Sequence, residues 1–161
     1  MSVTPDGYTA PPNPANLSPD QMPLRSHQAT FEGKGNGVDM WRYMSWAALA
    51  LGEQMGRLLV EVQTPGREMP AEPCALAQQF WGMEGECQVL TVGTAQVGVV
   101  VQPGSDQRFD QWAAYKHPDG GVVFVAQAKE IFGADRPALA ALPFTIFQLA
   151  NLATDERFHL K

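Results

Sequence analysis

Three histidines are the side chains best suited to metal binding in this 161-residue chain, but their spacing forms no motif. His27 lies in a proline-rich N-terminal stretch, His117 at a turn and His159 in the C-terminal tail. Zinc motifs normally place their ligands a few residues apart, and these three lie far from one another in the sequence. Ser105 and the two cysteines also lack the neighbours of an activated nucleophile. We therefore expect no metal site, no cofactor and no catalytic triad.

A polar group shared by two predicted strands offers a second kind of chemistry. Asp110 lies on one strand, and Gln127-Ala128-Lys129 lies on the next, across a turn at residues 117–121. This arrangement resembles the Asp…Gln-x-Lys variant of the metal-dependent PD-(D/E)xK and Mrr-like nucleases. The resemblance implies that Asp110 binds Mg²⁺ and that Gln127 lies on the ligand side. It also implies that Lys129 stabilises negative charge developing at a scissile phosphate.

That resemblance covers about twenty residues and requires a further upstream acid, which either Glu61 or Glu86 would have to supply. The formal charge of -6 and the absence of a basic cluster weigh against an enzyme acting on DNA. The simpler interpretation, which we favour, is a polar cross-strand group on a solvated sheet face. Nuclease activity is kept as an alternative hypothesis.

Composition favours one soluble domain with a protein partner. The eleven Lys and Arg residues are scattered, which argues against nucleic acid and against an anionic membrane surface. Within the first apolar segment predicted as a helix, the longest charge-free stretch is residues 43–52, which is too short to span a bilayer. No signal peptide is recognisable. Cys74 and Cys87 would pair in an oxidising compartment, but we favour free thiols and a cytoplasmic location.

Residues 87–129 predict four consecutive antiparallel strands. Valine-rich runs at 88–92 and 96–101 flank Gly93-Thr94, a pattern typical of a hairpin. A second hairpin joins residues 108–116 to 122–125 through the Pro-Asp-Gly-Gly turn. If its loop is 117–120, Lys116 faces Gly121 and Asp110 faces Gln127. The buried face would then comprise Phe109, Ala113, Tyr115, Val122 and Phe124.

Apolar residues at alternating spacings of three and four predict two long helices. The first begins near Asp39, a candidate cap, although residues 58–62 fit a strand equally well. The second begins near Asp135, with a kink or restart at Pro143. Residues 75–81 predict a short helix. The two apolar stripes are Trp41, Met44, Ala48, Leu51, Met55, Leu58 and Val62, and Leu139, Leu142, Ile146, Leu149 and Ala153.

Residues 1–37 predict an extended or disordered arm, because six prolines remove backbone donors and favour extended conformations. A solvated tail and an arm docked on a neighbouring subunit remain equally open. Apolar side chains would anchor a docked arm, and Tyr43 and Trp46 would add a second apolar face to the first helix. The predicted partner-binding residues are Tyr8, Leu17, Met22, Leu24, Phe31, Tyr43 and Trp46.

The sequence as a whole predicts an α+β domain at residues 38–161. Its fold would be a four-stranded antiparallel meander packed by two long helices and one short helix, preceded by the arm. The function that we favour is that of a non-catalytic, homo-oligomeric interaction or assembly protein, such as an accessory subunit or a virion-type structural component. The arm and the outer helix face would make the contacts. A third hypothesis is a small partner-specific binder, such as an immunity protein or a chaperone.

Overall fold

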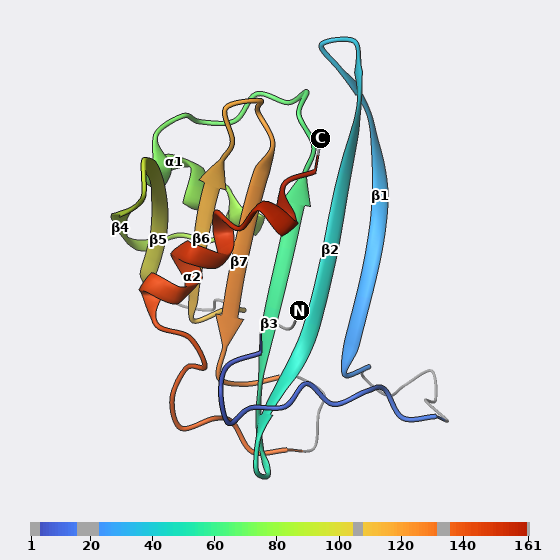
Figure 1. Cartoon of the computed structure of the whole chain (residues 1–161), viewed down its shortest axis with the longest axis vertical. Coiled ribbons are helices and arrows are strands. Elements are labelled where there is room, and N and C mark those ends of the chain that lie inside the picture. Colours follow the sequence, from blue (N-terminus) through green and yellow to red (C-terminus); the bar gives the residue numbers. More distant parts are fainter. Residues whose placement is uncertain (1–3, 16–22, 105–107, 132–135, 161) are drawn as a thin grey trace.

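A single antiparallel sheet of seven strands dominates the protein, in the order β1-β2-β3-β7-β6-β5-β4 (Figure 1). The computed structural model describes residues 4–15, 23–104, 108–131 and 136–160. The strands are β1 (Arg25–Gly35), β2 (Val38–Leu51), β3 (Gln54–Gln63), β4 (Gly85–Val92), β5 (Ala95–Pro103), β6 (Gln111–Lys116) and β7 (Val122–Ala128). The helices are α1 (Pro73–Ala77) and α2 (Ile146–Ala153), with 3-10 turns at Phe80–Gly82 and Glu156–Phe158.

The α+β prediction of a four-stranded meander packed by two long helices is therefore wrong, because the protein is mainly β. The first predicted helix is in fact the β2–β3 hairpin, which turns at Gly52 and Glu53 with Gly52 at a φ of 62°. From Met55 to Val62, β3 is buried on both faces except at Arg57. Its apolar residues therefore follow one another almost without interruption, and such a run fits a helical stripe as readily as a strand.

The end of the predicted arm is also a strand. Residues 25–35 form β1, which pairs with β2 in an antiparallel register. Asn36 and Gly37 connect the two strands, with φ angles of 52° and 80°. Positive φ at both central residues is the geometry of the tight hairpin turn that the Asn-Gly dipeptide favours. The last residues of the predicted arm thus contain a hairpin turn.

The four strands predicted between residues 87 and 129 are confirmed as β4 to β7, which lie in sequence order in the sheet. Gly93 and Thr94 form the β4–β5 turn as expected. The β6–β7 register is wrong by one residue: Lys116 faces Val122, and Gln111, instead of Asp110, faces Gln127. His117 donates its N–H to the carbonyl of Gly121, so the loop takes one residue more than predicted.

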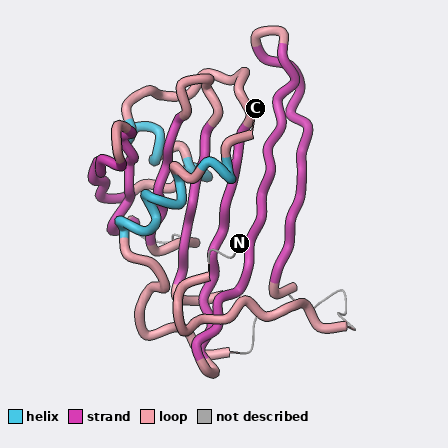
Figure 2. The backbone as a smooth tube through the Cα atoms, viewed as in Figure 1, coloured by secondary structure: helices cyan, strands magenta, loops and turns pink. Residues whose placement is uncertain are grey.

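The one-residue slip divides the predicted buried face between two cores. Phe109 and Phe124 are both buried, as predicted, on the α1 side of the sheet. Ala113 and Tyr115 lie on the α2 side. Every residue of β7 is buried, because α2 packs on one face and the aromatic cluster that includes Phe80 and Phe109 packs on the other. Figure 2 shows the helices, in cyan, beside this half of the sheet.

The C-terminal helix is shorter than predicted. It begins at Ile146, and the Thr145 hydroxyl and the Gln148 side chain form a capping box at its start. Residues 136–145 are not helical, so the predicted kink or restart at Pro143 is wrong; Leu139 also lies outside the helix, although its side chain is buried. After the helix, the chain makes a 3-10 turn at Glu156–Phe158. None of the helices in the described segments is long and apolar enough to cross a membrane.

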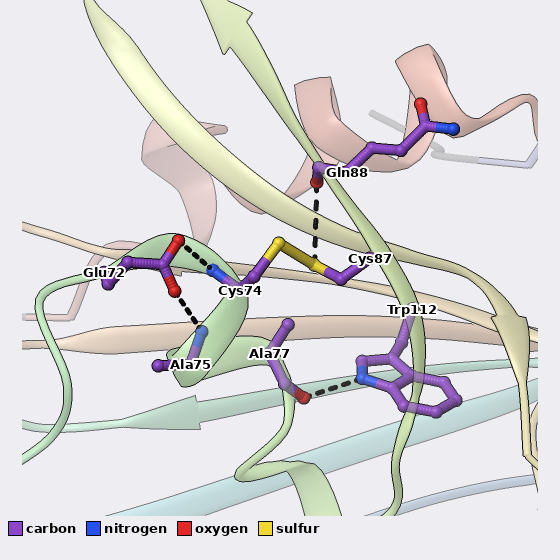
Figure 3. Close-up of a disulfide and its surroundings, with 7 residues drawn as sticks. All are labelled: Glu72, Cys74, Ala75, Ala77, Cys87, Gln88 and Trp112. Carbon is purple, nitrogen blue, oxygen red and sulfur yellow. Dashed lines mark hydrogen bonds between the residues drawn. A yellow bond between two sulfur atoms is a disulfide. The ribbon is translucent and has the colours of Figure 1, made fainter.

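A disulfide between Cys74 and Cys87 joins α1 to β4, so the expectation of free thiols is wrong (Figure 3). Glu72 caps α1, since its carboxylate accepts hydrogen bonds from the N–H groups of Cys74 and Ala75. The Trp112 indole, fully buried beneath α1, donates to the carbonyl of Ala77 at 2.8 Å. These contacts fix α1 on the sheet.

Candidate functional site

The residues that resemble a nuclease motif are engaged in structural contacts. Asp110 accepts a hydrogen bond from the backbone N–H of Lys129 at 2.8 Å. Gln127 is fully buried, and its amide bonds to the Gln111 side chain and to both backbone polar groups of Phe144. The Gln127 amide thereby connects β7 to the segment that leads into α2. Both its nitrogen and its oxygen are hydrogen-bonded, and neither is accessible to solvent.

The two candidate upstream acids lie apart from that group. Glu61 is almost fully buried on the α1 side of the sheet and accepts hydrogen bonds from the Trp81 indole and the Gln63 amide. Gln127 faces the α2 side, and Glu86 is exposed on β4. The described residues contain no group of three or more His, Cys, Asp or Glu side chains that could hold a metal ion.

Two of the three histidines meet at one end of the sheet. The rings of His117 and His159 stack at a centroid distance of 3.7 Å, and His159 contacts Asp119 at 2.9 Å and Glu156 at 3.5 Å. Burial lowers the pKa of His117, and the neighbouring His159 lowers it further. His27 lies on β1, outside this pair. The cluster attaches the C-terminal segment to the β6–β7 turn.

The same electrostatic environment lowers the pKa of Asp119. Burial acts to raise it, but hydrogen bonds from the Gly121 N–H and from His159 outweigh that effect. Because Phe158 directly precedes His159, the cluster also determines where the Phe158 ring lies. That ring forms part of the wall of the groove described next.

An apolar groove of about 500 Å³ lies on the α2 side of β1, β2 and β3. Among the described elements, α2 lies over the other half of the sheet and not over β1 and β2 (Figure 1). It contains no Asp, Glu, Lys or Arg among its lining residues. The lining consists of His27, Gln28, Ala29, Tyr43, Met44, Ser45, Trp46, Ala47, Leu58, Val60, Val62 and Phe158. An uncharged concave surface of this size is suited to an apolar partner segment.

Exposed aromatic rings continue this surface beyond the groove. Phe31 and Trp41 lie opposite each other on β1 and β2, with ring centroids 5.2 Å apart. Trp41 also stacks on Tyr43 at 6.1 Å. Phe31 is 51% exposed and Tyr43 is 37% exposed. Exposed apolar side chains that adjoin an apolar groove are typical of a protein-interaction surface.

The outer edge of this surface is β1, one of the two edge strands of the sheet. The side-chain amide of Asn13 binds both backbone groups of Arg25, accepting from its N–H at 2.9 Å and donating to its carbonyl at 3.0 Å. Asn13 thus occupies the position of a neighbouring strand at the start of β1. Beyond Arg25, an edge strand presents unpaired peptide groups on which another chain can pair.

The predicted partner-binding residues occupy different positions around this surface. Phe31 and Tyr43 lie on it, whereas Tyr8 packs against the core on the α2 side. The side chain of Trp46 packs on the opposite side of the sheet and, like Leu24, contacts the small core cluster around Met55. Leu17 and Met22 lie outside the described residues.

The described part of the arm binds its own chain. Thr9 and Ala50 form an isolated antiparallel bridge, with N–H···O distances of 2.9 and 2.8 Å. Tyr8 and Ala10 pack against the core beside this bridge. The edge of β1 and the ring contacts of Trp41 with Phe31 and Tyr43 were not predicted from the sequence, although Asn36-Gly37 is a recognisable hairpin signal.

No protein-family model, curated protein or solved structure matches this chain.

Proposed function

We propose that the protein is a non-catalytic interaction and assembly protein that associates with copies of itself through β1, β2 and β3. The observation that carries this proposal is the apolar groove, bordered by exposed aromatic rings and an open strand edge. Such surfaces on a folded domain favour contact with another protein. The scattered basic residues and the acidic balance give no support to a nucleic-acid partner.

Light scattering of the full chain across a concentration series would test this proposal. We expect the mass to rise from monomer to oligomer, and Tyr43→Glu to weaken that association at least tenfold. Val89→Glu on β4 is the matched control, because Val89 is 43% exposed and Tyr43 37%. A mass that stays monomeric at every concentration, or equal effects of the two substitutions, would refute self-association through this surface.

A small partner-specific binder is the second candidate, and the groove favours it. A different protein could place an apolar segment between Phe158 and the floor formed by Val60 and Val62. This hypothesis predicts that the isolated protein is a monomer and that Val60→Glu weakens its binding of a partner fragment. If Val60→Glu binds the fragment as tightly as the wild-type protein does, the groove is not the binding site.

The cytoplasmic location expected from the sequence stays a prediction, and the Cys74–Cys87 bond favours a different location. Structural disulfides persist mainly in oxidising compartments and are rare in the cytosol. Alkylation of the unreduced, denatured protein, followed by mass determination, would distinguish the two states. We expect no alkylation at Cys74 or Cys87 of protein taken from its native compartment.

A further inference from the structure

We propose that the second copy docks edge to edge through β1, in an antiparallel arrangement whose two-fold axis passes through Ala29. This inference rests on the self-association proposed above and specifies its geometry. It assigns the partner, the strand and the register. The direction in which the peptide groups of β1 point supports this arrangement.

The hydrogen bonds at the start of β1 reveal these directions. The carbonyl of Leu24 accepts from the N–H of Ala48 and therefore points towards β2. The N–H and carbonyl of Arg25 bind the Asn13 side chain instead, on the outer side. Hydrogen-bonding direction alternates along a strand paired on one side. The peptide groups of His27, Ala29 and Phe31 therefore point outward, and none of the described residues binds them there.

This open stretch has a limit at each end. Asn13 occupies the outer groups of Arg25 at one end. At the other end the register shifts between Phe31 and Lys34, and Gly33 takes a φ of 94°. Such a bulge ends regular pairing. The three open residues between these limits are centred on Ala29.

A two-fold axis through Ala29 pairs each of these three residues with an open residue of the second copy. Ala29 then faces Ala29 of the other copy, and His27 faces Phe31. In an antiparallel pair around a two-fold axis perpendicular to the sheet, residues that face each other lie on the same face. A shift of the axis to Gln28 or Thr30 would leave one open residue facing either the occupied Arg25 or the bulge.

The side chains are compatible with this register. Small alanine side chains meet at the axis, and an aromatic ring faces an imidazole on either side of it, a pairing that stabilises antiparallel strands. On the opposite face, Gln28 meets Thr30 and Ser26 meets Glu32, so no like charges face each other. Phe31 of the second copy would also lie beside His27 and so extend the lining of the first copy's groove.

Cysteine cross-linking tests the register with three single substitutions at surface positions of β1: Ala29→Cys, Gln28→Cys and Thr30→Cys. Residues of a hydrogen-bonded antiparallel pair have Cα atoms about 5.5 Å apart, which a disulfide can bridge. We expect Ala29→Cys alone to form a covalent dimer under mild oxidation. Gln28→Cys and Thr30→Cys should cross-link only when mixed, because each faces the other across the axis. Circular dichroism would verify that all three variants fold.

The outcomes separate this inference from the function on which it rests. A dimer in which Gln28→Cys or Thr30→Cys cross-links alone would move the axis and overturn the register. A dimer in which none of the three cross-links would overturn the β1 interface while leaving self-association intact. A protein that remains monomeric throughout the concentration series would refute both.

Discussion

The two halves of the sheet differ in what covers them. Strands β4 to β7, the covered half, have α1 on one face and α2 on the other, and a disulfide fixes α1 to β4. Among the described residues, neither helix packs extensively on strands β1 to β3, the open half; β3 is buried, but several apolar side chains of β1 and β2 remain exposed. The covered half therefore has a helical layer over each face, whereas β1 and β2 carry exposed apolar side chains without such a layer. That difference is the physical basis for assigning association to the open half.

Substitution of one large aromatic residue in each half should give the largest contrast. Phe124→Ala should lower the free energy of unfolding by about 3–5 kcal/mol, because the ring is fully buried in the core on the α1 side of the sheet. Phe31→Ala should change it by less than about 0.5 kcal/mol in the dilute monomer, as is typical of surface sites. Denaturant unfolding at low protein concentration would measure both. Similar losses would show that the open half is packed as tightly as the covered half.

Two leucines on β2 sharpen the comparison within the open half. Leu49 is 1% exposed and contacts the core on the α2 side, whereas Leu51, at the β2–β3 turn, is 42% exposed. Leu49→Ala should cost about 2–5 kcal/mol. Leu51→Ala should cost less than about 0.5 kcal/mol. Thermal or denaturant unfolding of the two variants would check this order. The reverse order would support the helical stripe predicted from the sequence, on which Leu51 is a core position.

Removal of the disulfide should weaken the covered half. Cys74 and Cys87 are 13 residues apart in the sequence. In the chain-entropy model a loop of about this length contributes about 3 kcal/mol to stability. The double substitution Cys74→Ser/Cys87→Ser should therefore lower the free energy of unfolding by about 3 kcal/mol. Reduced wild-type protein is the control and should lose the same amount, whereas unchanged stability on reduction would mean that the thiols are not paired.

The histidine cluster predicts a smaller, pH-dependent effect. Because burial lowers the pKa of His117 below its usual 6.5, the unfolded chain binds a proton more readily than the folded chain near that pH. Stability should therefore fall as the pH drops from 6.5 towards the folded-state pKa. The lowered pKa of Asp119 acts in the same direction, but below its usual value of 3.8.

His117→Gln should flatten the dependence of unfolding free energy on pH in the range just below 6.5. Unfolding curves recorded at several pH values would show this directly. His27→Gln, outside the cluster, is the matched control substitution. If His117→Gln retains the full wild-type slope in this range, another group is responsible for it.

The covered half was more predictable from the sequence than the open half. Valine runs separated by Gly93-Thr94 and by the turn at 117–121 specified four strands and their order. The β6–β7 register was missed by one residue because both faces of β7 are buried, so alternation gave no information on which side is inward. The residues of β3 were assigned to a helix for the same reason, because this strand is also buried on both faces.

The strands of the open half were not predicted, because the sequence features there are local and point to different structures. Asn36-Gly37 specifies a tight hairpin, but the prolines before it led to the interpretation of the whole segment as an arm. Phe31 was predicted to bind a partner as an anchor of the arm, and Tyr43 as part of a second apolar helix face. Both side chains are exposed, and partner binding by them stays a prediction. The groove could not be predicted, because it depends on the Phe158 ring and on strands that are distant in the sequence.

Amide hydrogen exchange on β1, measured as a function of protein concentration, tests the central claim most directly. The outward N–H groups of His27, Ala29 and Phe31 should exchange rapidly in dilute protein and become protected as concentration rises. The N–H groups of β4, the other edge of the sheet, should not change with concentration. Exchange at these three positions that does not depend on concentration, in protein that nevertheless associates, would contradict the assignment of assembly to the β1 edge.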